Sequence, residues 1–135
     1  LAQPKRRVMA LMGDAELMMG LYAVPTVAVR SPANLSVVCI DNGRFGETGS
    51  QVSHTSQGVD LAGIARASGY PHVMEVHNET GLDALRTAVH HAEGPLFAVI
   101  KVSSDMPSVV MPIRDAAIGK ARFREALLGE RGLKE

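Results

Sequence analysis

Two short acidic segments hold the side chains of this sequence whose types and spacing could do chemistry. Gly13 and Asp14 follow the apolar run VMALM, and Asp41 and Asn42 follow a second apolar run, LSVVCI. Apolar runs of this length are typical of buried strands, so each pair stands where a strand is expected to end. If the two strands are neighbours in a parallel sheet, Asp14 and Asn42 face the crevice in which such sheets bind ligands.

The chemistry that these residues could do is the binding of a hard cation together with a phosphate. A carboxylate beside a carboxamide and a glycine-rich loop offers oxygen donors, and Mg²⁺ usually takes only a few of its six oxygens from protein. A phosphate alone would be repelled by Asp14, whereas a phosphate that carries a divalent cation would use it. The alternatives are that Asp14 only caps a helix and that Asn42 with Gly43 only forms a tight turn.

The elements that must position these residues alternate between strands and helices. We expect Pro25 to break or kink the first helix, and Thr80 with Asp83 to cap a later one. Residues 42–58 are rich in glycine and small polar side chains and predict a long loop, which in a compact domain is usually functional. Alternation of this kind predicts an α/β fold with a parallel sheet. The expected strands are 8–12, 35–40, 72–76 and 96–102, and the expected helices are 16–30, 80–93, 116–128 and one that Asp60 caps and that runs to Ser68.

The composition excludes several classes of partner. The 135 residues carry 14 Lys plus Arg and 14 Asp plus Glu, so no net charge favours nucleic acid or an anionic membrane. The longest uncharged stretch, residues 17–29, is shorter than the about 20 residues that a membrane-spanning helix needs. Cys39 is the only cysteine, which excludes a disulfide within the chain, indicates a reducing, cytoplasmic setting and favours a place in the core.

The length favours one domain over residues 1–135, and the two ends carry further signals. The first residues, LAQPKRRV, are typical of the end of a helix that leads into a strand. We therefore expect a truncated edge, with an upstream segment that is missing or lies on another chain. The last six residues are charged and are expected to fray.

The spacing of the two acidic segments resembles a known motif. Gly13, Asp14 and Ala15, then 25 residues, then Asp41 and Asn42 are similar to the thiamine diphosphate-binding motif, which has Gly-Asp-Gly, a gap of similar length, and Asn-Asn or Asp-Asn. The resemblance covers most of the chain. The stretches DNGRFGETGSQVSHT, VDLAGIARASGY and GPLFAVIKV are most similar to the sulfopyruvate and phosphonopyruvate decarboxylases. The resemblance implies a three-layer α/β/α fold with a mostly parallel sheet, in the cofactor domain of a thiamine diphosphate-dependent 2-keto acid decarboxylase.

The resemblance also implies a set of site residues. Asp14 and the side-chain oxygen of Asn42 would ligate Mg²⁺, and the backbone carbonyl of Arg44 would supply a third ligand. Ala15 stands in place of the second glycine of the motif, and it strains or weakens the site if that glycine is needed for a positive φ or for close approach of the phosphate. We expect Glu16 to favour the first helical turn by its charge. The implied cofactor-binding residues are Gly13, Asp14, Ala15, Glu16, Asn42, Arg44, Phe45 and Gly46.

The sequence leaves two questions about the predicted active site undecided: the role of His54 and the source of the residue that activates the cofactor. His54, within the long loop, is either a solvated side chain or a catalytic group that contacts substrate or transfers a proton. In the family, a Glu from a separate pyrimidine-binding domain activates the cofactor across a subunit interface, and this sequence offers no candidate for it. We therefore expect a pyrimidine-binding partner, an oligomer, and no decarboxylase activity without the partner. The alternatives are a non-catalytic Mg-phosphate or nucleotide-binding regulatory module, and a carboligase of the acetolactate synthase type.

Overall fold

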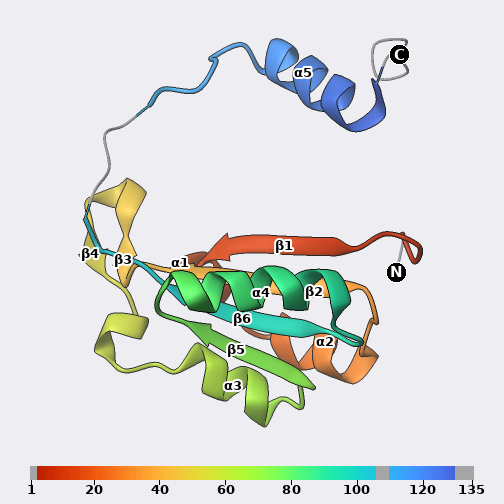
Figure 1. Cartoon of the computed structure of the whole chain (residues 1–135). Coiled ribbons are helices and arrows are strands. Elements are labelled where there is room, and N and C mark those ends of the chain that lie inside the picture. Colours follow the sequence, from red (N-terminus) through yellow and green to blue (C-terminus); the bar gives the residue numbers. More distant parts are fainter. Residues whose placement is uncertain (1–2, 106–109, 130–135) are drawn as a thin grey trace. The chain divides into compact units, whose positions relative to one another are not determined.

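A computed structural model describes residues 3–105 and 110–129 (Figure 1). By its internal contacts the chain divides into two compact units, residues 1–105 and residues 106–135. In the second unit, helix α5 (Ala116–Leu128) has the bounds expected from the sequence, and the Asp115 carboxylate caps it by accepting hydrogen bonds from two backbone N–H groups. The expected fraying of residues 130–135 lies outside the described residues.

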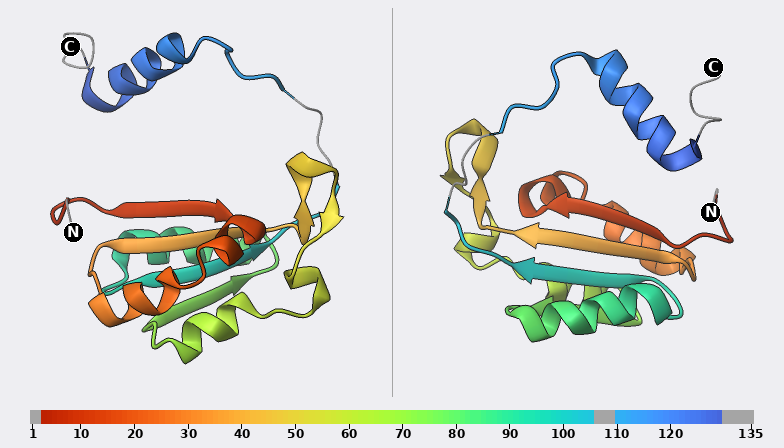
Figure 2. Two further views of the ribbon diagram at one scale, coloured as in Figure 1. Left: turned by 180° about the vertical axis from the view of Figure 1, so that it is seen from behind. Right: turned by 45° about the horizontal axis from the view of Figure 1, so that its top comes forward.

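Four parallel strands of the first unit form the sheet that positions the candidate site. Every neighbouring pair is parallel, so the four carboxyl ends lie along one edge of the sheet. Figures 1 and 2 show the small antiparallel hairpin of β3 (Arg44–Phe45) and β4 (Gln51–Val52) at that edge. The predicted parallel α/β sheet is confirmed, and each strand has the expected bounds to within one residue. In spatial order the strands are β1 (Val8–Gly13), β2 (Leu35–Asp41), β6 (Leu96–Lys101) and β5 (His72–Val76).

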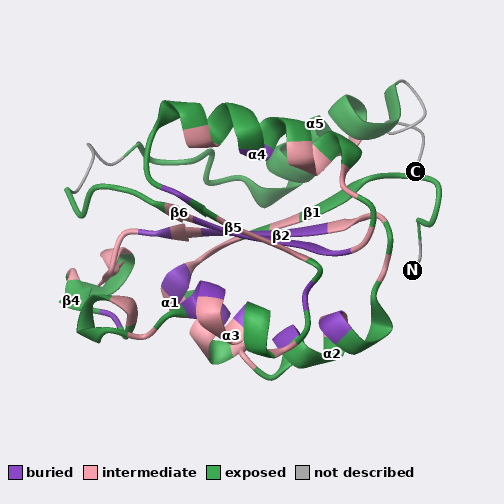
Figure 3. Ribbon diagram, turned by 60° about the horizontal axis from the view of Figure 1, so that its bottom comes forward, coloured by how far each residue is buried: buried purple, intermediate pink, exposed green. Residues whose placement is uncertain are grey.

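Helices cover both faces of the sheet, which makes the three layers that the resemblance implies (Figure 3). Side chains of the two central strands alternate between the faces, as the pleat requires. Cys39 and Phe97 belong to the core beneath three helices, whereas Val38 and Ala98 belong to the core beneath the fourth. Strands covered on both faces have continuously apolar sequences, which is why the apolar runs were visible. The three helices of one face are α1 (Asp14–Met19), α2 (Ala23–Arg30) and α3 (Leu61–Ala67), and the helix of the other is α4 (Glu79–His91).

The helix predicted over residues 16–30 is in fact two helices, and the break is not at Pro25. α1 ends at Gly20, whose N–H donates to the Glu16 carbonyl at 3.2 Å, and α2 begins at Ala23. Pro25 lies in the first turn of α2. Backbone N–H groups have no partner within the helix there, so the missing N–H of proline is tolerated.

The amino ends of the other two helices test the predicted caps. The Asp60 cap of α3 is confirmed, because its Oδ1 accepts a hydrogen bond from the Gly63 N–H at 2.8 Å. The Thr80 cap is wrong: α4 starts one residue earlier, and Asn78 caps it by accepting from the Gly81 N–H at 2.9 Å. Among the described residues, no helix has both the length and the apolar character that crossing a membrane demands.

Burial raises the pKa of two ionisable side chains in the core, Cys39 and Tyr70. Cys39 on β2 is 0% exposed, and removal from water, assisted by the negative Asp41 and Asp14, raises the pKa of its thiol to about 12. Tyr70 packs edge-on against Phe97 with ring centres 5.3 Å apart, and burial raises the pKa of its hydroxyl to about 12. The prediction that Cys39 is a core residue is confirmed.

Candidate functional site

The two acidic segments meet at one edge of the sheet, as the sequence predicts. β1 and β2 are neighbours with Gly13 opposite Ile40, so Asp14 and Asp41 stand at adjacent strand ends. Both side chains are buried, with Asp14 2% exposed and Asp41 3% exposed. A buried carboxylate is costly unless it is hydrogen-bonded or paired with a cation, so the partners of these two groups indicate what the site is built for.

Asp14 is the first residue of α1 and does not cap it. Gly13 occupies the cap position, and its N–H donates to the Glu16 carboxylate at 2.8 Å, so Glu16 serves the first helical turn. The Asp14 side chain instead accepts from hydroxyl groups: Ser53 Oγ donates to Oδ2, and Thr55 Oγ1 lies 3.0 Å from the same oxygen. In the described part of the first unit, Oδ1 of Asp14 has no hydrogen bond. The helix-cap alternative is therefore wrong.

Asp41 is held by three groups and has the cation that Asp14 lacks. Lys101 Nζ at the end of β6 lies 2.5 Å from Asp41 Oδ2. Thr55 Oγ1 donates to Asp41 Oδ1 at 2.7 Å, and the Gly43 N–H donates to the same oxygen at 3.0 Å. Within the described part of the first unit, no Lys or Arg side chain pairs with Asp14. One buried negative charge therefore stands without a cation, which is the condition that a bound metal ion would satisfy.

The turn after β2 is fixed by its own groups. Asn42 Oδ1 accepts a hydrogen bond from the Arg44 N–H at 2.9 Å. Gly43 between them has φ 66°, a left-handed conformation that favours glycine, and a Cβ there would make a tight contact of 3.2 Å with the Cβ of Ser56. The amide oxygen of Asn42 keeps a second lone pair, so it can form this turn and still ligate a metal.

The segment predicted as a loop over residues 42–58 carries regular structure. It contains the β3–β4 hairpin and two 3₁₀ turns, η1 (Gly46–Thr48) and η2 (Thr55–Gln57). The Ser53 N–H donates to the Gly43 carbonyl at 2.9 Å, which makes Arg44 and Val52 a pair without hydrogen bonds to each other. In such a pair the carbonyls point away from the partner strand. The Arg44 carbonyl is thus outside the hairpin ladder and available to a ligand.

These donors fit a magnesium ion better than a metal held by protein alone. The site offers a carboxylate oxygen, an amide oxygen and a backbone carbonyl from adjacent segments, and all three are hard ligands. Within the described residues, no group of three or more His, Cys, Asp or Glu side chains could hold a metal ion. Mg²⁺ takes few ligands from protein and completes its octahedron with phosphate oxygens and water, so a sparse donor set suits it.

The remaining predicted site residues lie on the same segments. Phe45 and Gly46, in and after β3, are half-buried, and so is Ala15 in α1. Ala15 has an ordinary helical backbone, since the only non-glycine residues with positive φ in the described chain are Ser31 and Ser50. The replacement of the motif's second glycine therefore strains no backbone angle in this structure.

His54 is the predicted catalytic residue that the structure does not join to the carboxylates. Its side chain is exposed, and its carbonyl accepts hydrogen bonds from the N–H groups of Gln57 and Val59. The flanking Ser53 and Thr55 instead turn their hydroxyls to the carboxylates. A role of His54 in binding substrate or transferring a proton stays a prediction.

Three residues of the site were missed by the sequence interpretation: Ser53, Thr55 and Lys101. Lys101 is a charged residue that ends an apolar strand, and Ser53 and Thr55 are hydroxyl residues two positions apart. Those signals are weak, because the partners are 39 residues away for Ser53 and 60 for Lys101. Only the fold brings them together.

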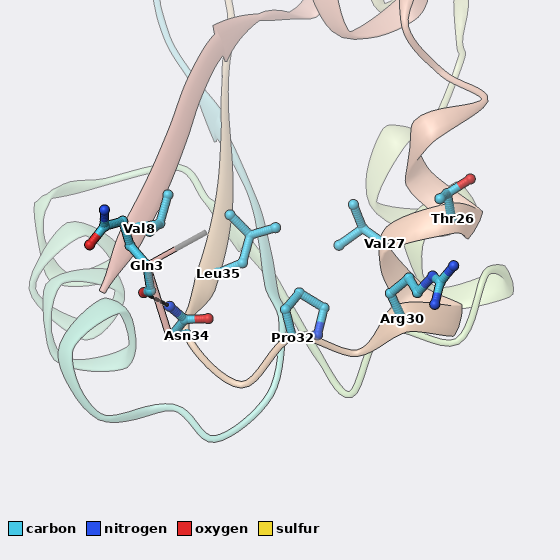
Figure 4. A pocket seen from close by; sticks show the side chains of 8 residues that line it. All are labelled: Gln3, Val8, Thr26, Val27, Arg30, Pro32, Asn34 and Leu35. Atoms are coloured by element: carbon cyan, nitrogen blue, oxygen red, sulfur yellow. Dashed lines mark hydrogen bonds between the residues drawn. The ribbon is translucent and has the colours of Figure 1, made fainter. Parts of the chain in front are cut away.

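The apolar cavity shown in Figure 4 lies away from these residues. It has a volume of about 340 Å³ and is lined by Val8 and Leu35 of the sheet and by Arg30 of α2. Val8 and Leu35 begin the strands that Gly13 and Asp41 end, so this cavity is at the opposite edge of the sheet. It is not part of the candidate site.

Comparison with known proteins identifies the first unit. The model of the thiamine pyrophosphate enzyme family, C-terminal TPP-binding domain, matches residues 1–102. The chain belongs to this family. Thiamine pyrophosphate is thiamine diphosphate under another name, so the resemblance carried by the two acidic segments is confirmed. The matched residues include the whole sheet and every residue of the candidate site.

Several relatives of this TPP-binding domain are named as decarboxylases. The sulfopyruvate decarboxylase subunit beta of Methanothermobacter thermautotrophicus is 31% identical over 78% of this chain and 55% of its own length. The phosphonopyruvate decarboxylase of Streptomyces hygroscopicus is 35% identical over 88% of this chain and 27% of its own. A crystallised Mycobacterium smegmatis protein, described as a thiamin diphosphate-dependent enzyme, matches 77% of this chain and 19% of its own, at 25% identity and a TM-score of 0.52. The chain thus spans about half or less of each of these proteins.

Proposed function

We propose that this domain binds the magnesium–diphosphate end of thiamine diphosphate and forms one half of the active site of a 2-keto acid decarboxylase of the sulfopyruvate or phosphonopyruvate type. The observation that carries the proposal is the buried Asp14, which has no cation partner among the described residues of its unit, beside Asn42, which follows the next strand. The family supports the cofactor, and the names of the relatives support the class of reaction.

The residues of this chain would bind and orient the cofactor. Asp14 and Asn42 would ligate Mg²⁺ through their side chains, and Arg44 through its carbonyl. When bound, thiamine diphosphate supplies the nucleophilic carbon and the electron sink that decarboxylation of a 2-keto acid needs. The backbone that would line the diphosphate belongs to Gly13, Ala15, Glu16, Phe45 and Gly46.

The proposal includes a partner that supplies the other half of the site. Two carboxylates of the first unit are already engaged within it: Glu16 accepts from the Gly13 N–H, and Glu75 pairs with Arg66 at 2.5 Å. The resemblance implies that the Glu that activates the cofactor would come from a pyrimidine-binding domain or subunit, in an oligomer. Several relatives are named as beta subunits, which supports a partner.

Calorimetric titration of the complete protein with thiamine diphosphate tests the cofactor assignment. Binding should require Mg²⁺ and vanish in EDTA, and Mg–ATP should not bind. Asp14→Ala and Asn42→Ala should each abolish binding while circular dichroism shows an intact fold. Binding that is unchanged in both variants, or a preference for ATP, would contradict the proposal.

The reaction is tested separately from the binding. The complete protein, saturated with thiamine diphosphate and Mg²⁺, should release CO₂ from sulfopyruvate or phosphonopyruvate. The organic product should be the corresponding aldehyde. A product with a new carbon–carbon bond would instead make the protein a carboligase.

A further inference from the structure

The hydroxyl group of Thr55 stands between the two buried carboxylates. Its Oγ1 lies 2.7 Å from Asp41 Oδ1, 3.0 Å from Asp14 Oδ2 and 3.1 Å from Ser53 Oγ. A threonine hydroxyl has one proton, and Thr55 can share it between Asp41 Oδ1 and Asp14 Oδ2, which both lie within hydrogen-bond distance. Ser53 Oγ donates a second hydrogen bond to Asp14 Oδ2, so both hydroxyl groups hold that oxygen.

Asp41 is itself anchored independently of Thr55. Lys101 stands opposite Asp41 in the β2–β6 register, and its ammonium group pairs with the carboxylate oxygen that Thr55 does not use. The Gly43 N–H holds the other oxygen. Because both carboxylate oxygens of Asp41 are held in this way, Asp41 also fixes the orientation of the Thr55 hydroxyl that donates to it. Outer groups of this kind orient the ligands of a metal ion.

We propose that Thr55 and Lys101 are positioning residues for the metal ion. Lys101 anchors Asp41, Asp41 orients the Thr55 hydroxyl, and Thr55 with Ser53 holds Asp14 Oδ2 so that Oδ1 is left for the metal. The inference rests on the proposed function. It gives a role to residues from β6 and from the segment after β4 that supply none of the expected metal ligands.

The direction in which Lys101→Met changes the affinity for Mg²⁺ separates a positioning role of Lys101 from simple charge repulsion. Lys101 is a cation close to the place of a second cation. Coulomb's law alone therefore predicts that Lys101→Met tightens the binding of Mg²⁺. If Lys101 acts by anchoring Asp41, the same substitution weakens that binding, because the released carboxylate no longer holds Thr55 in place. Thr55→Val changes no charge and removes only the hydroxyl, so it tests the positioning role directly.

The readout is the Mg²⁺ concentration that gives half-maximal binding of thiamine diphosphate, measured on the complete protein with its pyrimidine-binding domain or subunit. Thr55→Val and Lys101→Met are each expected to raise this concentration about tenfold or more, the usual effect of losing a group that orients a metal ligand. Thr55→Ser keeps the hydroxyl and Lys101→Arg keeps the charge, so both are expected to stay close to the wild type.

Arg66→Met is the matched control. The Arg66–Glu75 ion pair is also 2.5 Å long, but it is more exposed and lies at the β5 edge of the sheet, between α3 and β5. Its loss should leave the Mg²⁺ requirement unchanged. Thermal unfolding of the ligand-free proteins shows which variants keep their fold, and if Lys101→Met does not fold, the two Thr55 variants decide.

Two different results would overturn the inference, and they can be told apart. If the wild type requires Mg²⁺ but Thr55→Val binds it equally well, or Lys101→Met binds it more tightly, the positioning role is wrong and the proposed function stands. If thiamine diphosphate binding by the wild type does not depend on Mg²⁺, the proposed function fails and this inference fails with it.

Discussion

Asp14→Asn should separate the stability of the domain from its ability to bind a metal. Asp14 Oδ2 and Asp41 Oδ1 lie within about 5.7 Å of each other, because Thr55 Oγ1 is 3.0 Å from one and 2.7 Å from the other. Two unit charges at that separation repel by about 0.7 to 3 kcal/mol for an effective dielectric constant between about 80 and 20. Lys101 offsets part of this repulsion through Asp41. The neutral amide has the shape of the carboxylate and can hydrogen-bond to Ser53 as donor or acceptor. We therefore expect Asp14→Asn to raise the free energy of unfolding of the ligand-free protein by up to about 1 kcal/mol.

The same variant should lose Mg²⁺-dependent binding of thiamine diphosphate, because an amide oxygen carries no charge to offset that of the metal. Denaturant unfolding of the complete protein in EDTA gives the stability, and calorimetric titration with and without Mg²⁺ gives the binding. A drop of more than about 2 kcal/mol in the free energy of unfolding would show that the carboxylate stabilises the fold itself, in conflict with this account. Full retention of metal-dependent binding would equally refute it.

Four further outcomes are expected. Gly43→Ala should lower the free energy of unfolding by about 1 to 2 kcal/mol, measured by denaturant unfolding, because a side chain is strained at φ 66° and meets Ser56; an unchanged stability would mean that the turn relaxes freely. Cys39 should resist alkylation at pH 8 until the protein unfolds, as followed by mass spectrometry, and fast labelling of folded protein would contradict its burial. The pKa of the Cys39 thiol is near 9.0 in the unfolded chain and about 12 in the folded protein. Above pH 9.0 the unfolded chain loses this proton while the folded protein keeps it, so the free energy of unfolding should fall as the pH rises above 9.0. The 135-residue chain alone, shown to be folded by circular dichroism, should release no CO₂ from either keto acid with saturating cofactor and Mg²⁺, and robust turnover would remove the need for a partner.

The sheet was predictable largely because its two central strands are covered on both faces. Continuous apolar runs marked three of the four strands, and Asp60 marked the start of α3. The predictions failed where a local signal had two interpretations. Pro25 suits the first turn of a helix as well as a break within one, and the choice depended on how α1 and α2 pack.

The candidate site was predictable only for the residues that follow strands. Asp14 and Asn42 stand next to apolar runs, so the rule for parallel sheets brings them together. Ser53, Thr55 and Lys101 reach the carboxylates through contacts between distant segments, and no pattern along the chain encodes such contacts. The hairpin was missed because its two strands have two residues each, too few for a period to show.

The origin of the site's groups ties ligand binding to completion of the fold. Asp14 comes from the start of α1, Asp41 and Lys101 from two strands, and Thr55 from the segment beyond β4, and their contacts span 14 to 60 residues of sequence. A partly folded chain with an unpaired β6 would lack the Lys101 anchor, so a ligand that needs this arrangement has affinity for the native state alone. Such a ligand shifts the folding equilibrium by mass action, by about 2.7 kcal/mol at a free concentration one hundred times its Kd. The concentration of the free ligand would therefore determine what fraction of the chain is folded.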